Sequence, residues 1–293
     1  MRLLIAEHES NYCADVGKHA LERLRLPRSR GTLRLSFKRR DEKIVFGDLY
    51  QQGCLRARMP RCDGGSFSEA VVINTSGGLT GGDRTAVVAE WAPATAAAVC
   101  GQAAEKIYRA LSGAAEVSNV LHVGASATAE WLPQETILFN GAALKRSLDV
   151  NLHESSSFLG IESVVFGRTA MREEVVSGHM RDQWRIFRGG KLIYADVFRL
   201  SGAISEQLNR TAIAAGGRAF ATIIYTARSI AQDLLEALRE VLGHARGRAA
   251  ASLWNGILAA RFIAPDGEAL RHDISQALRV LRNGRALPRV WQC

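Results

Sequence analysis

The 293-residue sequence contains five cysteines, and no two of them form a C-x-x-C pair. They are scattered, at Cys13, Cys54, Cys62, Cys100 and Cys293. An odd, unclustered set argues against a disulfide framework and against a structural zinc site, and it suits reduced thiols in the cytoplasm. The seven histidines are equally dispersed and include no H-E-x-x-H pattern, so no tightly bound metal or other cofactor is predicted.

Long apolar runs are also missing. No stretch approaches the roughly 20 apolar residues that a membrane helix needs, and the first 25 residues lack the apolar core of a secretory signal. We therefore expect a cytoplasmic protein with no membrane partner. Because no linker, repeat or low-complexity tract divides the chain, we predict a loosely ordered leader over residues 1–30 and one domain over residues 31–293.

Catalytic signatures are the third absence. No Ser/His/Asp or Cys/His arrangement suggests a nucleophile. A pair of acids for hydrolysis cannot be selected from the 29 acidic residues without geometry. The sequence therefore predicts no enzymatic activity for the isolated chain.

Positive charge is abundant. The net charge is +9 and most of the excess is arginine, which permits a nucleic acid, a membrane surface or an acidic protein as partner. Because no helix-turn-helix, zinc-finger or RNA-binding signature accompanies the charge, an acidic protein is favoured and no nucleic-acid partner is predicted. Basic nucleic-acid binding is kept as the weakest alternative.

Short alternating segments dominate the pattern. Leu33, Leu35 and Phe37 alternate with polar residues, and the chain returns at 43–46, which indicates a β-hairpin. A second hairpin is predicted from 183–188 and 191–200 around Gly189-Gly190. Further strands are expected at 85–91, 95–100, 116–123, 127–132, 136–139, 145–152, 220–226 and 257–263. The apolar run 158–166 is too short to assign by its period.

Two helices are predicted in the C-terminal quarter. Ser229 is expected to cap the first, which ends at Gly243, and Asp266 begins the second, which ends at Gly284. The predicted fold class is therefore mainly β, a β-rich sandwich-like body of many short strands with a few helices.

The residues Asn74 to Asp83 read N-T-S-G-G-L-T-G-G-D and lie between two strand-like runs. Four glycines indicate a sharp turn with room above its backbone, and the short polar side chains can hydrogen-bond such a turn. A phosphate-binding P-loop is disfavoured, because Asp83 and Arg84 occupy the positions of its lysine and hydroxyl residue and a carboxylate repels phosphate.

Four further motifs break the strand pattern. They are Q-A-A-E-K-I-Y-R (102–109), W-L-P-Q-E-T-I-L-F (131–139), G-R-T-A-M-R-E (167–173) and P-R-V-W (288–291). Taken singly, each is compatible with a structural role. The glycines could form only a tight turn, Pro-Gln-Glu only a corner, and Glu105 and Arg109 an ion pair on a surface helix.

Taken together and in this order, the five motifs resemble the family of urease accessory proteins UreD, also called UreH. The resemblance extends from about residue 31 to the C-terminus and includes G-T-L-R-L-S-F-K-R (31–39) and D-L-Y-Q-Q-G-C-L-R (48–56). The residues that match the family pattern are Asn74, Gly77, Gly78, Gly81, Gly82, Gln102, Lys106, Tyr108, Arg109, Pro133, Gln134, Gly167, Arg168, Met171, Pro288, Arg289 and Trp291.

The resemblance implies a non-catalytic scaffold for urease maturation. Its expected partners are UreF, the GTPase UreG and the urease apoprotein subunits, on which the complex docks for nickel insertion. It also implies a mostly β fold with a few helices.

Transient passage of Ni²⁺ through the chain is the mechanism attached to this family. Passage requires weak, replaceable oxygen or imidazole ligands. The acids within the motifs are Asp83, Glu105, Glu135 and Glu173, and we predict that some of them line a hydrated nickel path. Two alternatives stay open: Glu105 and Glu173 could only neutralise Arg109 and Arg168, or the chain could be an adaptor without metal contact.

Overall fold

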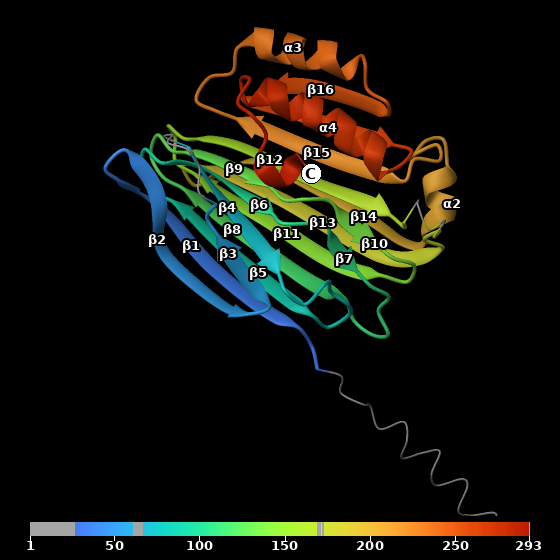
Figure 1. Ribbon diagram of the computed structural model, residues 1–293. Helices are drawn as coiled ribbons and strands as arrows, with labels where there is room; N and C mark the ends of the chain where they lie inside the picture. The colour runs from blue at the N-terminus through green and yellow to red at the C-terminus, as the bar shows by residue number, and fades with distance from the viewer. Residues whose placement is uncertain (1–26, 61–66, 169–170, 172, 293) are drawn as a thin grey trace, which may run out of the picture.

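The computed structural model describes residues 27–60, 67–168, 171 and 173–292. Two large β-sheets form its body, and two helices cover one of them (Figure 1). We call the sheets A and B. Within the described residues, the strands of sheet A in spatial order are β14 (Lys191–Ala203), β13 (Ser177–Arg188), β11 (Ala143–Leu152), β8 (Ala115–Val123), β5 (Arg84–Trp91), β1 (Arg30–Arg40) and β2 (Lys43–Gly53).

Sheet B is built from shorter strands. In spatial order they are β16 (Arg248–Trp254), β17 (Ile257–Ala264), β15 (Ala219–Thr226), β12 (Ser157–Phe166), β9 (Thr128–Leu132), β6 (Ala96–Gly101), β4 (Ser68–Asn74) and β3 (Leu55–Arg58). Two short strands, β10 (Thr136–Leu138) and β7 (Glu105–Ile107), attach beside β12. The mainly β class predicted from the sequence is confirmed.

The chain winds between the two sheets. From β4 to β13 it passes repeatedly from sheet B to sheet A and back, so each turn adds a strand to each sheet. The central neighbours are consequently parallel, as in β5 with β8 and in β6 with β9. The predicted hairpins are both present as antiparallel pairs, β1 with β2 and β13 with β14.

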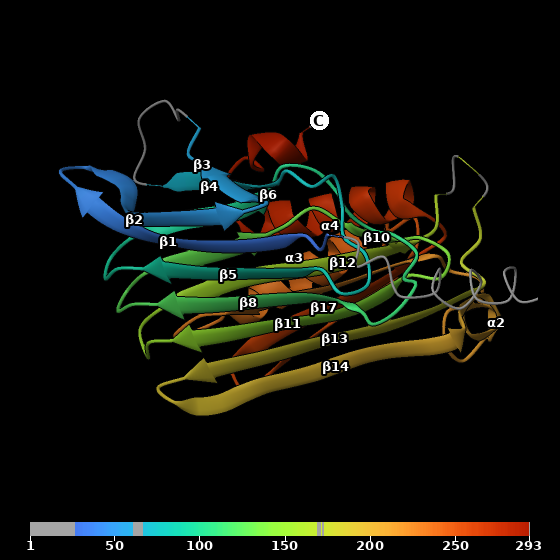
Figure 2. The same ribbon diagram turned by 90° about the horizontal axis from the view of Figure 1, so that it is seen from below.

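Burial on both faces of sheet B explains why the apolar run 158–166 shows no alternation. Nine of the ten residues of β12 are buried, because one face of sheet B meets sheet A and the other lies beneath helices. Strands buried on both sides are continuously apolar, so the alternation that identifies a half-buried strand is lost. Sheet A has an open outer face, and β5 shows the expected alternation (Figure 2).

Three α-helices are present in the described residues, α2 (Ile204–Asn209), α3 (Gln232–Leu242) and α4 (Gly267–Leu281), and a short 3-10 helix, η2 (Arg289–Trp291), follows them. The predicted cap of α4 is confirmed, since Asp266 Oδ1 accepts a hydrogen bond from the Ala269 N–H at 2.8 Å. The cap predicted for α3 is wrong: the helix starts three residues after Ser229, and its N-cap is Ala231, which makes no side-chain cap. A serine before an apolar residue is compatible with extended chain as well as with a helix start.

The inter-sheet core is divided. At one end, Leu33, Phe37 and Trp91 of sheet A pack against Val99 and Trp131 of sheet B. At the other end, a separate group includes Leu144, Met180 and Phe166. Between the two lies a space that polar side chains enter, and the sequence motifs lie around it.

Candidate functional site

A cavity of about 260 Å³ lies between the two sheets, and we call it the inter-sheet cavity. Its apolar lining comes from both core groups, for example Leu55, Val99 and Leu144. Its polar lining residues are Asn74, Thr85, Gln102, Glu105, Lys106, Asn119, Gln134, Thr136, Arg146 and Glu162. Gln102 and Lys106 are exposed, whereas Thr136, Arg146 and Glu162 are buried, so the cavity runs from a surface rim to a buried floor.

Three of the sequence motifs form the rim. Leu79 of the glycine loop pairs with β7: its N–H donates to the Lys106 carbonyl, and the Tyr108 N–H donates back to the Leu79 carbonyl, both at 2.7 Å. The Glu105 N–H donates to the carbonyl of Glu135 in the third motif. The motifs are therefore neighbours because β7 lies between the glycine loop and β10.

Close approach requires glycine at the rim. A β-carbon on Gly78 would lie 2.5 Å from the Tyr108 ring and 2.7 Å from the Lys106 carbonyl oxygen, and Gly78 has a φ of +141°. A β-carbon on Gly81 would lie 2.3 Å from the Ser112 carbonyl oxygen. The predicted room above the loop backbone is thus filled at Gly78 and Gly81 by β7 and by the segment that follows it, whereas the space beside Gly77 is open.

Glu105 is the predicted acid that lines the cavity. Both of its carboxylate oxygens accept from Asn74 Nδ2, at 3.1 and 3.0 Å, and no cation is paired with it in the described part of the chain. Burial raises the pKa of the Glu105 carboxyl, and the hydrogen bonds from Asn74 and the Lys106 backbone oppose that rise. These two neutral donors leave lone pairs of the carboxylate available to a ligand in the cavity.

The other three predicted acids do not line the cavity. Asp83 is buried, and its two oxygens accept from the Ser29 and Thr80 N–H groups, each at 2.8 Å, which fixes the end of the glycine loop. Glu135 is paired with Arg271 at 3.3 Å, and Glu173 with Arg168 at 2.8 Å. Glu105 and Glu135 are backbone neighbours, but the structure gathers no cluster of these acids, and the described residues contain no group of three His, Cys, Asp or Glu that could hold a metal.

The alternative that Glu105 and Glu173 only neutralise arginines holds for one of the two acids. The predicted pair of Glu173 with Arg168 is present. The interpretation of Glu105 and Arg109 as an ion pair on a helix is wrong, because Glu105 belongs to strand β7 and its partner is Asn74. In a strand, residues four apart lie too far apart to pair.

The floor of the cavity holds charged residues that the sequence motifs do not contain. Arg146 contacts Glu162 at 2.5 Å and Asp182 at 2.6 Å, and its Nη1 donates to Thr136 Oγ1 at 2.9 Å. Glu162 also accepts from Trp131 Nε1 at 3.0 Å. Burial raises the pKa of Glu162 to about 7; Arg146 and the Trp131 hydrogen bond oppose the rise, and Asp182 adds to it.

A signal for these residues was present in the strand period. Arg146 lies two residues from both Leu144 and Leu148 along the strand, and Asp182 lies two residues from Trp184. Alternation along a strand therefore places both on the buried face. Glu162 is the one charged residue in the apolar run 158–166, which is a second such signal.

The C-terminal motif closes the back of the site. Gln134 Nε2 donates to the Val290 carbonyl at 2.7 Å, and Arg271 of α4 donates to Gln134 Oε1 at 2.6 Å. Trp291 is buried, and its Nε1 donates to the Leu132 carbonyl at 3.0 Å. Residues 288–291 therefore hold the segment 132–134 that lines the cavity.

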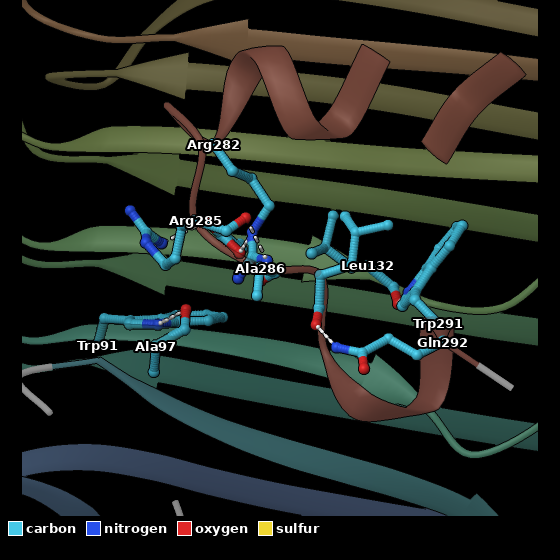
Figure 3. A network of polar contacts seen from close by, with 10 residues as sticks. Trp91, Ala97, Leu132, Arg282, Arg285, Ala286, Trp291 and Gln292 are labelled. Atoms are coloured by element: carbon cyan, nitrogen blue, oxygen red, sulfur yellow. Dashed lines mark hydrogen bonds and ion pairs between the residues drawn. The ribbon is translucent and has the colours of Figure 1, made fainter. Parts of the chain in front are cut away.

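A second buried ionic cluster anchors the chain just before this motif. Arg282 and Arg285 donate to the two oxygens of buried Glu130, at 2.9 and 2.7 Å, and Arg282 also contacts the Ala286 carbonyl. Figure 3 shows both arginines and Trp291 on the same side of sheet B. Cys100 lies buried nearby, and burial raises its pKa well above the usual value, so its thiol stays protonated and inert.

The fold and cavity define a class: a two-sheet β-protein whose motifs build a polar internal cavity. No described helix has the length and apolar composition that crossing a membrane requires. The profile of the family described as UreD urease accessory protein matches residues 29–292. The chain belongs to this family.

Individual relatives agree over nearly their whole length. A urease accessory protein UreD of Rhizobium johnstonii is 46% identical over 264 residues, which is 90% of this chain and 95% of the relative. Proteins of the same name from Azorhizobium caulinodans and Chelativorans sp. are 43% and 45% identical, and the matches span 97% and 95% of those chains and 91% of this one.

Proposed function

We propose that the chain is a non-catalytic accessory factor for urease maturation in the cytoplasm. In this proposal it assembles with UreF and the GTPase UreG on apo-urease and assists nickel insertion. Family membership supports the role, and the relatives are named as accessory proteins.

The observation that carries a metal-handling role is the convergence of three family motifs on one polar cavity. Ni²⁺ in transit needs few and replaceable oxygen ligands. Glu105 supplies one carboxylate at the rim, and the Gln102 amide is a neutral group on the same lining. The amide oxygens of Asn74 and Gln134 already accept hydrogen bonds, from Ser76 and Arg271. We propose that Ni²⁺ enters past Glu105 as cargo, with no site that retains it.

The floor of the cavity limits this path. Both Glu162 oxygens are engaged, one by Trp131 and one by Arg146. Arg146 therefore occupies the Glu162 oxygen that a divalent cation would need. A cation passing this point must therefore displace a strong ion pair, so the proposed path is centred on the rim. A nickel role for Asp83, Glu135 and Glu173 stays a prediction, and their contacts give each a structural role.

A pure adaptor without metal contact is the second candidate, and the structural contacts of Asp83, Glu135 and Glu173 favour it. Glu105→Gln separates the two candidates, because glutamine keeps a hydrogen-bond acceptor for Asn74 but removes the anionic ligand. With the chain co-expressed with urease apoprotein, UreF and UreG, we expect an assembled complex and several-fold lower nickel content and activity of the urease.

Glu236→Gln is the matched control, since it removes an exposed acid of helix α3 that lies outside the motifs and the cavity, and it should load nickel normally. Normal nickel loading with Glu105→Gln would overturn the metal path and leave the adaptor. A wild-type chain that did not associate with the other components would overturn the accessory role itself.

A further inference from the structure

Strand register aligns a row of cations across the outer face of sheet A. Six residues on adjacent strands are direct register partners, each with the next, and we call them the basic row: Arg30, Arg84, Glu116, Lys145, Arg181 and Arg199. At a strand spacing of about 4.8 Å, the five steps span about 24 Å.

The charge of this row is largely uncompensated. All five cations are exposed, and five cations with one carboxylate leave four positive charges in excess. Arg84 is paired with Glu116 at 2.9 Å, and Arg181 donates to the neutral Gln183. Lys145 and Arg199 have no carboxylate within ion-pair distance among the described residues.

The row borders an open surface. Two residues further along each strand, the next row of outward-facing residues is small or uncharged, and Ala86, Ser118 and Ser147 lie in its middle. Helices α3 and α4 lie over sheet B, and no described element crosses the outer face of sheet A (Figure 2). A depression of about 260 Å³ lies between the two rows, lined by Arg30, Arg84 and Glu116 with Thr32, Ala86 and Ser118.

The same strands form the wall of the inter-sheet cavity. Thr85, Val117 and Arg146 line the cavity and are sequence neighbours of Arg84, Glu116 and Lys145, whose side chains point the other way. A partner seated on the basic row would therefore bind directly behind the cavity, at the end of sheet A where β5 leaves the glycine loop.

We propose that the basic row is a docking surface for an acidic face of a partner protein, with a carboxylate of that partner entering the depression between Arg30 and Arg84. An open surface of small neutral residues with an arginine border suits a protein interface. A nucleic-acid duplex presents two phosphate backbones, whereas this charge is one straight row interrupted by a carboxylate. This inference rests on the proposed function, because that function supplies the assembly of urease apoprotein, UreF and UreG in which the acidic partner is sought.

The test reverses charge at four positions of the row: Arg84→Glu, Lys145→Glu, Arg181→Glu and Arg199→Glu. The control reverses four exposed cations elsewhere: Lys38→Glu, Arg40→Glu, Lys43→Glu and Arg279→Glu. Binding of each full-length chain to the immobilised assembly of urease apoprotein, UreF and UreG is measured by biolayer interferometry at low and physiological salt. We expect the row variant to bind at least about tenfold more weakly and with less salt dependence, and the control to bind as wild type.

Two further variants protect the test against loss of folding. The four Gln substitutions at the row positions remove charge without reversing it and should give a smaller loss. Glu116→Gln removes the one acid of the row and should tighten binding. Circular dichroism of each variant checks that the fold is intact.

Three outcomes would contradict the inference or reassign the basic row to another partner. Wild-type affinity in the row variant would overturn the inference and leave the proposed function standing. Tighter binding of the wild type to a DNA duplex than to the assembly, lost in the row variant, would reassign the row to nucleic acid. No binding of the wild type to the assembly would overturn both proposals.

Discussion

At the scale of the residue, the buried cluster of Arg146, Glu162 and Asp182 determines how the cavity responds to pH. One guanidinium faces two carboxylates at 2.5 and 2.6 Å, so the fully ionised cluster carries an excess negative charge in a buried position. Removing a charge from water is costly unless it is balanced. Protonation of Glu162, whose pKa is raised to about 7, relieves that excess.

The stability of the protein should therefore fall as Glu162 ionises. The folded pKa of about 7 lies above the ordinary 4.5, so the contribution of the bound proton is complete below 4.5 and is lost as pH rises through 7. Glu162→Gln cannot ionise. Relative to that variant, the free energy of unfolding of the wild type should decrease steadily as pH rises across this window.

Urea denaturation at a series of pH values measures the difference. Glu116→Gln, which removes a surface acid, serves as the control, and its curve should run parallel to that of the wild type. Parallel curves for the wild type and Glu162→Gln would contradict the prediction.

At the scale of the element, helix α4 has a side-chain N-cap whose contribution to stability can be measured. Asp266 accepts from the Ala269 N–H, and the first turn of α4 starts there. Asp266→Ala should lower the free energy of unfolding by about 1 kcal/mol, because a helix N–H then loses its acceptor. Ser229→Ala is the matched control from the other predicted cap. It should have little effect, and equal losses for the two substitutions would show that Asp266 has no special role.

The pairing of the strands also belongs to this scale. Buried and more exposed residues alternate along β5, β8 and β11, as a sheet with one open face requires. This alternation alone orients the cavity residues inward and the basic row outward. A register shift by one residue would exchange the two sets. The cavity and the basic row are therefore two consequences of one register.

At the scale of the whole molecule, the C-terminal segment ties the helical layer to the cavity wall. Trp291 is 4% exposed, and its indole N–H reaches Leu132, 159 residues earlier in the chain. Trp291→Ala should cost about 3–5 kcal/mol, the range for removing a large buried aromatic residue. Urea denaturation and the yield of soluble protein measure the loss, which is a large part of a typical domain stability.

Gln292→Ala is the control at this scale. Gln292 is exposed and donates to Leu287, so its removal should change stability by less than about 1 kcal/mol. A Trp291→Ala protein as stable as the control would mean that the C-terminal segment does not hold the layers together.

Local chemistry made much of this molecule predictable. Alternating apolar residues placed the strands of sheet A, glycine pairs placed the second hairpin, and Asp266 placed a helix start, because each acts over a few residues. The ordered motifs identified the family in the same way. Parallel pairing was not predictable from these signals, because an alternating strand has the same pattern whether its neighbour is parallel or antiparallel.

By itself, the sequence determined the β class, the family and which residues share the face of a strand. Only the tertiary structure decided which motifs meet. It placed Glu105 at a cavity rim beside Asn74, fixed Asp83 to backbone N–H groups, and aligned five cations from five strands. Those outcomes depend on contacts between residues far apart in the chain, and strand register, which sets them, is established only when the sheets pair and pack.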